Sequence, residues 1–359
     1  MRRASRRRVR LFLWFSFAGA LIGVGYGALI GAMFRRTGLI GGAIGAIDGA
    51  AIAGPIAGIE LFFLPTRWGR AVRQAPFLVT FGVKWLIYGT WISVINLRSP
   101  GVSALGLFSL AAPLPREVAL LSVGFSFAAA FAVLFVFEVS QIVGPRNLWH
   151  ILLGRYHQPR LEERFFLFID IQGSTPLAEQ IGPVAVHRFL GRVFALASDP
   201  IGDHRGEIYQ YVGDEMVVTW TLGEGHRNAR PIACFFSIVA AVERAAAEFE
   251  REFGVVPRLR AALHAGPVIS GEIGESKRDI VFHGDVMNTA ARLEQATRDL
   301  NRQFLVSADA LHRLEGMDRH GVEPLGLQPL RGRQAPVDVC AITSVTRGAR
   351  GSEGAYRKS

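Results

Sequence analysis

Charged residues are scarce in this sequence. Asp, Glu, Lys and Arg make up 19% of its 359 residues, against roughly 25% in an average soluble protein, and 50% of the residues are hydrophobic. So apolar a chain is not intrinsically disordered, and it is too long for a disulfide-stabilised miniprotein. Cysteine is also rare. Cys234 and Cys340 lie far apart and lack metal-ligand or redox spacing, which indicates free thiols in a reducing compartment.

Acidic residues are few in the first half of the chain. The formal net charge of +10 would by itself suggest nucleic acid or an anionic membrane as a partner. Residues 1–160 carry a net charge of +13, from 17 Lys and Arg against 4 Asp and Glu, whereas residues 161–359 carry −3. Because the basic excess lies wholly in the hydrophobic half, we expect no nucleic-acid partner.

Four apolar stretches fill the first half. Each is near or above the roughly 20 residues that a helix needs to cross a hydrocarbon core about 30 Å thick. We therefore predict an α-helical membrane domain over residues 1–143, with helices at about 11–34, 39–64, 77–97 and 118–143. Residues 101–115, which Gly and Pro interrupt, are predicted to form a loop or a re-entrant piece.

Arginines give the orientation of these helices. They cluster before the first stretch, between the second and third stretches, and after the fourth, and they are fewer in the other two connections. The positive-inside rule then places both termini and everything after the fourth helix in the cytosol. A signal peptide is the rival interpretation of the N-terminus, but its apolar run would be shorter, about 7–15 residues.

The membrane stretches also contain small and charged residues. Glycines recur at four-residue spacing, as in Gly41/Gly45, which favours close helix packing within a chain or across a dimer. Glu60, Lys84 and Glu138 are predicted to reach an interface, whereas Asp48 is expected either to make a structural hydrogen bond or to take part in sensing.

The second half changes to an alternation of strands and helices. The order is a buried strand at 165–169, a helical stretch to about 198 interrupted at Gly182-Pro183, and a hairpin turning at Gly213-Asp214. A helix at 227–253, a second hairpin turning at Gly266-Pro267, a helix at 285–299 and three strands near 304–306, 321–330 and 337–342 complete it. This order predicts an α+β sheet with helices on one face. Residues 346–359 are predicted to be a disordered tail.

Two carboxylates stand where chemistry can occur. Asp170 ends the buried strand, and Asp214 lies at the hairpin turn beside it. Converging carboxylates can hold divalent ions around a triphosphate, because Mg²⁺ prefers a couple of carboxylates, phosphate oxygens and water. Gly173-Ser174-Thr175 begins a helix and offers N–H groups to phosphate. The alternative is that Asp170 and Ser174 only cap a helix and that Asp214 only makes a turn.

Four blocks in this order and spacing resemble the class III nucleotidyl cyclase catalytic domain. They are FIDIQGST (168–175), YQYVGDE (209–215), RAALHAG (260–266) and HGDVMNTAARL (283–293). The resemblance covers about half the chain and implies a ferredoxin-like catalytic domain, here residues 164–345, that works as a head-to-tail homodimer. Residues 144–163 are similar to the juxtamembrane coupling element of membrane-anchored members.

The resemblance also implies roles for individual residues. Asp170, Asp214 and the carbonyl of Ile171 match metal ligands for two Mg²⁺ or Mn²⁺ ions per site. Phosphate contacts are implied for Gly173, Ser174, Thr175, Arg260 and Arg331, with Arg333 as a weaker alternative to Arg331. Asn288 and Arg292 match the pair that the other subunit contributes to the transition state, and their four-residue spacing places them on one helix face.

The base-reading positions depart from the family pattern. Gln210 stands where adenylate cyclases usually carry Lys, and Val281 stands in place of the usual Asp or Thr. Gln210 can donate and accept hydrogen bonds, so it could serve adenine or guanine, whereas Val281 has no polar group with which to read a base. His283 lies nearby and could substitute.

The sequence therefore favours an adenylate cyclase anchored in a bacterial inner membrane by several spans. The expected partners are a nucleoside triphosphate, a second copy of the chain, the bilayer and an unknown signal at the membrane domain. A guanylate cyclase is the first alternative, and a catalytically silent nucleotide-binding membrane receptor is the second. A diguanylate cyclase is disfavoured because Val212 replaces the second glycine of its motif.

Overall fold

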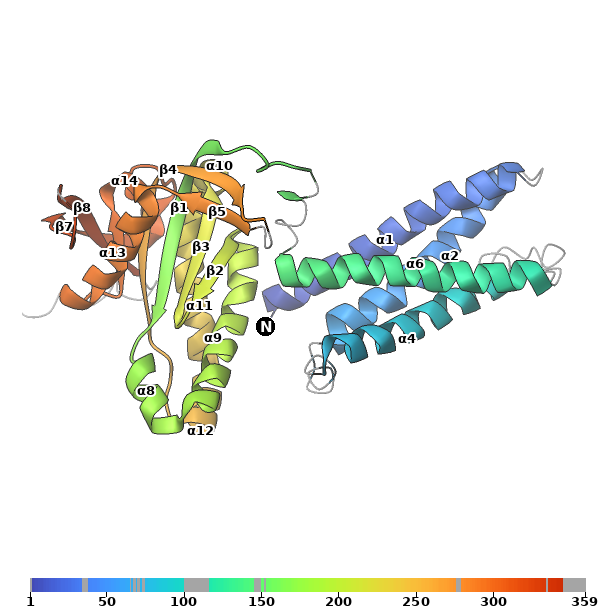
Figure 1. The fold of residues 1–359 in the computed structure, drawn as a ribbon, viewed down its shortest axis with the longest axis horizontal. Helices are drawn as coiled ribbons and strands as arrows, with labels where there is room; N and C mark the ends of the chain where they lie inside the picture. Colours follow the sequence, from blue (N-terminus) through green and yellow to red (C-terminus); the bar gives the residue numbers. More distant parts are fainter. Residues whose placement is uncertain are drawn as a thin grey trace, which may run out of the picture. The chain divides into compact units, whose positions relative to one another are not determined.

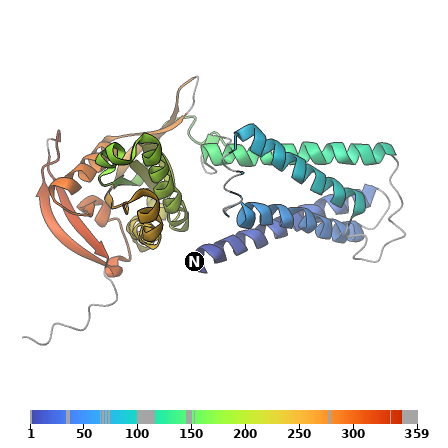
Figure 2. The same cartoon turned by 90° about the horizontal axis from the view of Figure 1, so that it is seen from below.

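The structure is a computed structural model that describes residues 2–33, 38–64, 66, 69, 72, 75–99, 116–144, 150–151, 153–275, 279–333 and 335–344. The chain forms two compact units, Met1–Leu148 and Trp149–Ser359, which are drawn in Figures 1 and 2. The predicted loop at 101–115 and the predicted tail at 346–359 lie outside the described residues.

The first unit is a set of apolar helices. They are α1 (Arg2–Met33), α2 (Gly38–Gly58) with the π-helical turn η1 (Ile59–Phe63), α4 (Phe77–Arg98) and α6 (Arg116–Val143). All four contain a segment long and apolar enough to cross a membrane, so the predicted four helices are confirmed. α1 begins at Arg2 rather than near residue 11, since the arginines ahead of its apolar part are good helix formers.

Helices α1 and α2 pack backbone to backbone. A Cβ atom placed on Gly23 would lie 1.9 Å from the carbonyl oxygen of Gly45, and one on Gly45 would lie 2.0 Å from that of Gly23. Gly19 and Gly49 approach each other in the same way, with 2.7 and 2.2 Å to the opposing oxygens. Only glycine fits at these crossings, as the four-residue spacing predicted.

The charged residues of the membrane helices pair with one another. The Lys84 ammonium lies 3.0 Å from a Glu60 oxygen and 2.8 Å from a Glu138 oxygen, and the Tyr88 hydroxyl donates to Glu60 at 2.9 Å. Ion pairing inside the unit therefore satisfies these charges; that they reach an interface stays a prediction. Asp48 accepts a 2.6 Å hydrogen bond from the Ser99 hydroxyl.

The second unit is built on one mixed sheet. Its described strands are β1 (Arg160–Ile171), β2 (Glu207–Val212), β3 (Glu215–Thr221), β4 (Leu259–Ile273), β5 (Asp279–His283), β6 (Phe304–Ser307), β7 (His320–Gln328) and β8 (Val337–Ser344). They lie in the order β2-β3-β1-β4-β6-β8-β7, and β5 pairs with β4. β1 is antiparallel to both β3 and β4, whereas β6 is parallel to β4. The first four strands therefore have the ferredoxin-like arrangement, with β1 in the interior of the sheet.

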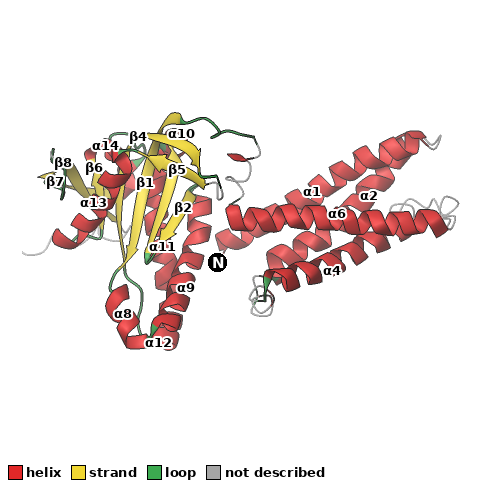
Figure 3. Cartoon of the chain, in the orientation of Figure 1, coloured by secondary structure: helices red, strands yellow, loops and turns green. Residues whose placement is uncertain are grey.

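Helices cover both faces of this sheet (Figure 3). Alternate β1 residues Phe165, Leu167 and Ile169 face the main core, which is closed by α8 (Ser174–Ile181), α9 (Pro183–Asp203), α11 (Arg230–Arg244) and α12 (Ala246–Phe253). Phe166 and Phe168 face the opposite side, where α13 (Asp285–Asp299) packs through residues such as Val286 and Ala290. We predicted helices on one face of the sheet only. That prediction was incomplete, because α13 covers the second face.

The second hairpin differs from its prediction. β4 runs unbroken through Gly266 and Pro267, and its hairpin partner is β5. Along one edge β4 pairs with β6 at Ala261–Leu263 and with β5 from Ile269 onward. Pro267 falls between these two ladders, where its missing N–H costs no strand hydrogen bond.

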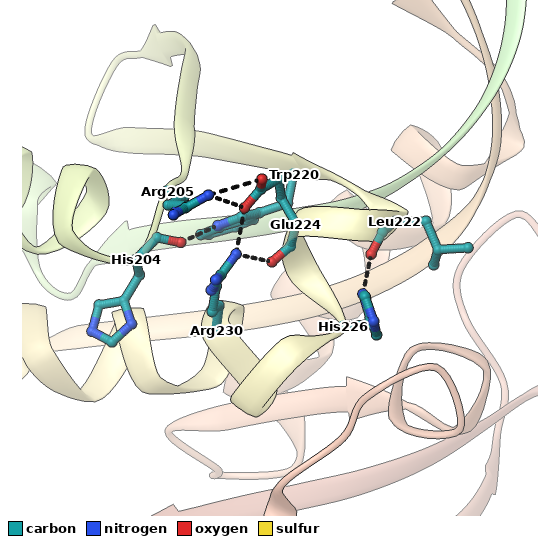
Figure 4. Close-up of polar contacts among 7 residues, drawn as sticks. All are labelled: His204, Arg205, Trp220, Leu222, Glu224, His226 and Arg230. Atoms are coloured by element: carbon teal, nitrogen blue, oxygen red, sulfur yellow. Dashed lines mark hydrogen bonds and ion pairs between the residues drawn. The ribbon is translucent and has the colours of Figure 1, made fainter.

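Short elements join the larger ones. The predicted helix at 227–253 is divided into the 3-10 turn η3 (Arg227–Ala229), α11 and α12. Figure 4 shows how the end of β3 is fixed: the Trp220 indole donates to the His204 carbonyl at 2.9 Å, and Glu224 of α10 (Leu222–Gly225) pairs with Arg205 and Arg230. α14 (Ala308–Leu311) and η4 (Met317–Arg319) precede β7.

Candidate active site

The two predicted metal carboxylates meet at one end of β1. Asp170 is the penultimate residue of that strand and is 3% exposed. In the β1–β3 ladder it lies opposite Glu215, so Asp214, in the turn just before Glu215, is delivered beside it. On the other side of β1, Asp170 lies opposite Arg260 of β4. The antiparallel sheet thus brings together residues that are 44 and 90 positions apart in the sequence.

Glycines shape the two turns that carry the carboxylates. Gly173 precedes α8 with a φ of +75°, and Gly213 precedes Asp214 with a φ of +61°. Both values lie in the left-handed region that favours glycine. The turn at Gly173 places the hydroxyl of Ser174, the first residue of α8, so that it donates a hydrogen bond to Asp214. Thr175 is exposed.

Electrostatics at this end of β1 are dominated by negative charge. Burial raises the pKa of Asp170, and the nearby Asp214 carboxylate raises it further, while Arg298 and Arg260 oppose that shift. Arg298, on the last turn of α13, donates to Asp170 at 3.1 Å. A buried carboxylate with a second carboxylate beside it forms a donor set that fits a hard divalent cation.

The protein supplies only part of a metal's coordination shell. Among the described residues, no group of three or more His, Cys, Asp or Glu side chains gathers as a metal site. Ile171, whose side chain is buried, can contribute only its backbone carbonyl. Two carboxylates and a carbonyl leave positions for water and phosphate oxygens, which is the mixed coordination that Mg²⁺ tolerates.

Positive charge lies next to the carboxylates. Arg260 is half-buried and lines a cavity of about 420 Å³ together with Gln172, Arg258 and Arg302. With three arginines against one glutamate, Glu243, the lining carries net positive charge, which makes this end of β4 attractive to an anion such as a phosphate group.

The predicted transition-state pair lies elsewhere on α13. Asn288 is exposed and Arg292 is half-buried, ten and six residues before Arg298 respectively. At a rise of 1.5 Å per residue these positions lie roughly 15 and 9 Å along the helix from the residue that contacts Asp170. One chain therefore does not gather Asn288 with its own metal carboxylates.

The late basic residues belong to the Asn288 end of α13. Arg333 pairs with Asp285 at 2.9 Å and also donates to the Thr289 hydroxyl, so it is anchored to the helix. Arg331 is exposed. The turn between them runs beside Arg292, since a Cβ atom on Gly332 would lie 3.6 Å from the Arg292 guanidinium.

The candidate base-reading residues lie on β2 and β5, which are not neighbours in the sheet but carry two rings that contact each other. The rings of Tyr209 on β2 and Phe282 on β5 lie 4.9 Å apart. Gln210 follows Tyr209 and is exposed, while Val281 and His283 flank Phe282, with Val281 half-buried and His283 exposed. Because side chains alternate along a strand, Val281 and His283 point to the face of β5 opposite to Phe282. The β2–β3 register shifts between Ile208 and Gln210.

Sequence reasoning missed three residues of the carboxylate cluster: Glu215, Glu294 and Arg298. Glu294 is 3% exposed, and burial, with the Asp170 charge next, raises its pKa to about 7. Burial and the Glu294 charge likewise raise the pKa of Glu215 to about 7. The sequence does indicate that Glu294 is buried, because this acid falls four residues after Ala290 in the apolar stripe of the helix.

The sequence of this chain is similar to a known protein family. Residues 157–340 match the adenylate and guanylate cyclase catalytic domain. A protein of Rhizobium meliloti called adenylate cyclase 2 is 36% identical over 322 residues, which cover 88% of this chain and 86% of that protein. So long a match must extend beyond the catalytic domain into the apolar helices. The chain belongs to the class III adenylate and guanylate cyclase family.

Further proteins match about half of the chain. Adenylate cyclase 1 of Rhizobium meliloti is 28% identical over 192 residues, which cover 52% of this chain and 28% of that protein. A crystal structure of the adenylyl cyclase CyaB from P. aeruginosa has a TM-score of 0.45 and 20% identity, and the match covers 53% of this chain and 98% of that chain.

The raised pKa of Glu294 predicts a pH-dependent stability. Its value rises from 4.5 to about 7 on folding, so this group's stabilising contribution is complete below pH 4.5 and is lost as the pH rises through about 7. The loss is about 3 kcal/mol. Glu294→Gln should therefore raise the stability of metal-free protein above neutral pH and leave it unchanged in acid, with Glu215 retaining part of the slope.

Chemical denaturation of the purified chain across a pH series measures this effect. Glu323→Gln, which removes an exposed carboxylate paired with Arg302, is the matched control and should follow the wild-type curve. Equal curves for wild type and Glu294→Gln would contradict the prediction.

Proposed function

We propose that the protein is a membrane-anchored adenylate cyclase that converts ATP into 3′,5′-cyclic AMP and pyrophosphate at a homodimer interface. The observation that carries the proposal is the convergence of Asp170 and Asp214 at the end of β1, beside the Ser174 turn and Arg260. The extended similarity to a protein called adenylate cyclase 2 supports adenine as the base.

Divalent metal is part of this proposal. Asp170, Asp214 and the Ile171 carbonyl would hold two Mg²⁺ or Mn²⁺ ions. When bound, such ions lower the pKa of the ribose 3′-hydroxyl and neutralise triphosphate charge. Asp170 is buried and lies close to Asp214. Both features favour the binding of divalent ions, because a cation relieves the repulsion between the two carboxylates.

The remaining residues act on the substrate. Arg260, Arg331 and the Gly173–Thr175 turn hold the phosphates, so that the ribose 3′-oxygen faces the α-phosphorus in line with the pyrophosphate. The new P–O bond forms as the bond to pyrophosphate breaks, and the hydroxyl proton passes to water. Arg292 and Asn288 donate to the oxygens on which charge grows in the transition state, where fixed donors are most effective.

A second copy of the chain is needed to complete each site. Arg298 ties the last turn of α13 to Asp170 of its own chain, whereas Asn288 lies roughly 15 Å further along the same helix. A head-to-tail dimer would bring Asn288 and Arg292 of one chain to the carboxylates of the other. Two equivalent sites follow from the two-fold symmetry.

The first unit would anchor the enzyme in a bacterial inner membrane, with both termini and the catalytic unit in the cytosol. We propose that it also regulates catalysis through residues 144–163 in response to a signal at the membrane. Support comes from Tyr156, which is 1% exposed and accepts a 3.1 Å hydrogen bond from Arg164. Arg164 lies over the Phe282 ring at 4.7 Å, and Phe282 contacts Tyr209.

This chain of contacts ends at the candidate base pocket. Phe282 lies between Val281 and His283, and Tyr209 precedes Gln210. Arg164 is 1% exposed. Its guanidinium also donates to Glu162 at 2.9 Å and to Glu207 at 3.4 Å. The guanidinium therefore links β1, β2 and β5. A displacement of Tyr156 would therefore reach both strands that face the base.

Turnover of ATP and GTP by the purified full chain tests the function. We expect cyclic AMP as the main product, and we expect Asp170→Ala and Asp214→Ala each to abolish turnover while the protein stays folded. Preferred use of GTP would establish the guanylate alternative, which Gln210 permits. Nucleotide binding without any cyclic product would instead show a silent receptor and overturn the proposal.

Complementation tests the shared site. Asp170→Ala and Arg292→Ala are each expected to be inactive alone, because each removes one half of every site. Mixed dimers of the two variants contain one complete site out of two, so coexpression should restore roughly a quarter of wild-type activity. If the mixture stays as inactive as its components, both halves of the site come from one chain.

Coupling through Arg164 predicts a defect in nucleotide binding. Arg164→Lys keeps the charge but loses the branched guanidinium and its several N–H donors. The KM for ATP should therefore rise several-fold, with little change in kcat. A flexible Gly-Ser insertion after Gly144 interrupts the same path from the first unit to the base-reading strands. In a chain with this insertion, Arg164→Lys should cause no further rise in KM. Arg192→Lys is the matched control, since Arg192 also pairs with two glutamates and lies over a ring. Additive effects of insertion and Arg164→Lys would refute the coupling.

A further inference from the structure

Arg298 contacts the carboxylate that the proposed metal ions would use. Its guanidinium lies 3.1 Å from an oxygen of Asp170, whose side chain is 5% exposed, whereas the Arg298 side chain is 58% exposed. The carboxylate is therefore fixed, and the arginine is free to swing on its long stem. A guanidinium and a divalent cation both draw on the lone pairs of the same carboxylate, so they compete for Asp170.

Glu294 offers Arg298 a second partner. It lies one helical turn earlier on α13, and residues four apart on a helix are neighbours on its surface. Glu294 is 3% exposed, and its Oε1 atom has no hydrogen-bond partner within the described part of the chain. A buried acceptor without a donor is costly, which indicates that a donor reaches it in another state of the site.

We propose that Arg298 is an internal counter-cation that holds Asp170 in the metal-free site and moves to Glu294 when a divalent ion binds. The inference rests on the proposed metal role of Asp170. Arg298 and Glu294 are then positioning residues that set metal affinity. The guanidinium neutralises Asp170 before the ion arrives, and Glu294 receives it afterwards, so that Arg298 has an acidic partner in both states.

Opposite effects of the two residues on metal affinity follow from this exchange. Arg298→Ala removes the competitor and should tighten Mn²⁺ binding by roughly fivefold or more. Glu294→Gln keeps the size of the side chain but removes the ionised acceptor for the displaced arginine, so Mn²⁺ should bind more weakly. Arg205→Ala is the matched control: it removes an arginine whose side chain is likewise 58% exposed and which pairs with Glu224, and it should leave Mn²⁺ affinity unchanged.

The double variant distinguishes the exchange from general electrostatics. If Glu294 acts only as a nearby negative charge, Glu294→Gln weakens Mn²⁺ binding equally whether or not Arg298 is present. If Glu294 acts by receiving Arg298, the substitution has no effect in the Arg298→Ala background. The double variant should then bind Mn²⁺ as tightly as Arg298→Ala alone.

Titration of the purified full chain with Mn²⁺ in the absence of nucleotide, with free Mn²⁺ measured by electron paramagnetic resonance, provides the readout. Asp170→Asn should abolish tight binding. If Asp170→Asn binds normally, the metal assignment under the proposed function is wrong. If Asp170→Asn fails to bind but Arg298→Ala binds no more tightly than wild type, or Glu294→Gln weakens binding equally in both backgrounds, the exchange itself is overturned.

Discussion

The catalytic unit is organised around two carboxylates that repel each other. Asp170 is buried at the end of an interior strand, and the β2–β3 turn holds Asp214 against it. Like charges in such a place are costly, and the surrounding structure limits that cost through the Ser174 hydroxyl and the Arg298 guanidinium. A site that stores repulsion in this way gains most from binding a cation. Three features hold this pair of carboxylates in place: the order of the strands in the sheet, the glycine turns and the last turn of α13.

The membrane unit solves a related problem by pairing. Lys84 lies between Glu60 and Glu138, and the Tyr88 hydroxyl adds a donor, so three charges from separate segments satisfy one another. Elsewhere the unit uses the absence of side chains, since Gly23 and Gly45 let two backbones touch. Both devices fix the relative positions of helices without hydrophobic burial, which gives little driving force between helices in lipid.

Local sequence pattern predicted the elements whose residues determine their own conformation. The run Phe165–Ile169 identified the buried strand, and the apolar spacing after Gly284 predicted α13 to the residue. The pattern failed where distant segments decide the outcome. β4 continues through Pro267 because two partners leave that position free, and Lys84 finds acids 24 and 54 residues away. Motif spacing named Asp170, Asp214, Asn288 and Arg292, but no local pattern tells which of them one chain brings together.

Helix α13 joins the two halves of the proposed dimer mechanism. Its last turn contacts Asp170 of its own chain through Arg298, while Asn288 and Arg292, nearer its start, would serve the site of the other chain. The helix is continuous over 15 residues and is packed against β1 and β4. Release of Arg298 from Asp170 by a metal ion would therefore act on the same rigid element that presents the transition-state donors to the neighbouring site. Metal occupancy in one site and donor placement in the other are then linked through one helix, and the two sites of the dimer would not be independent.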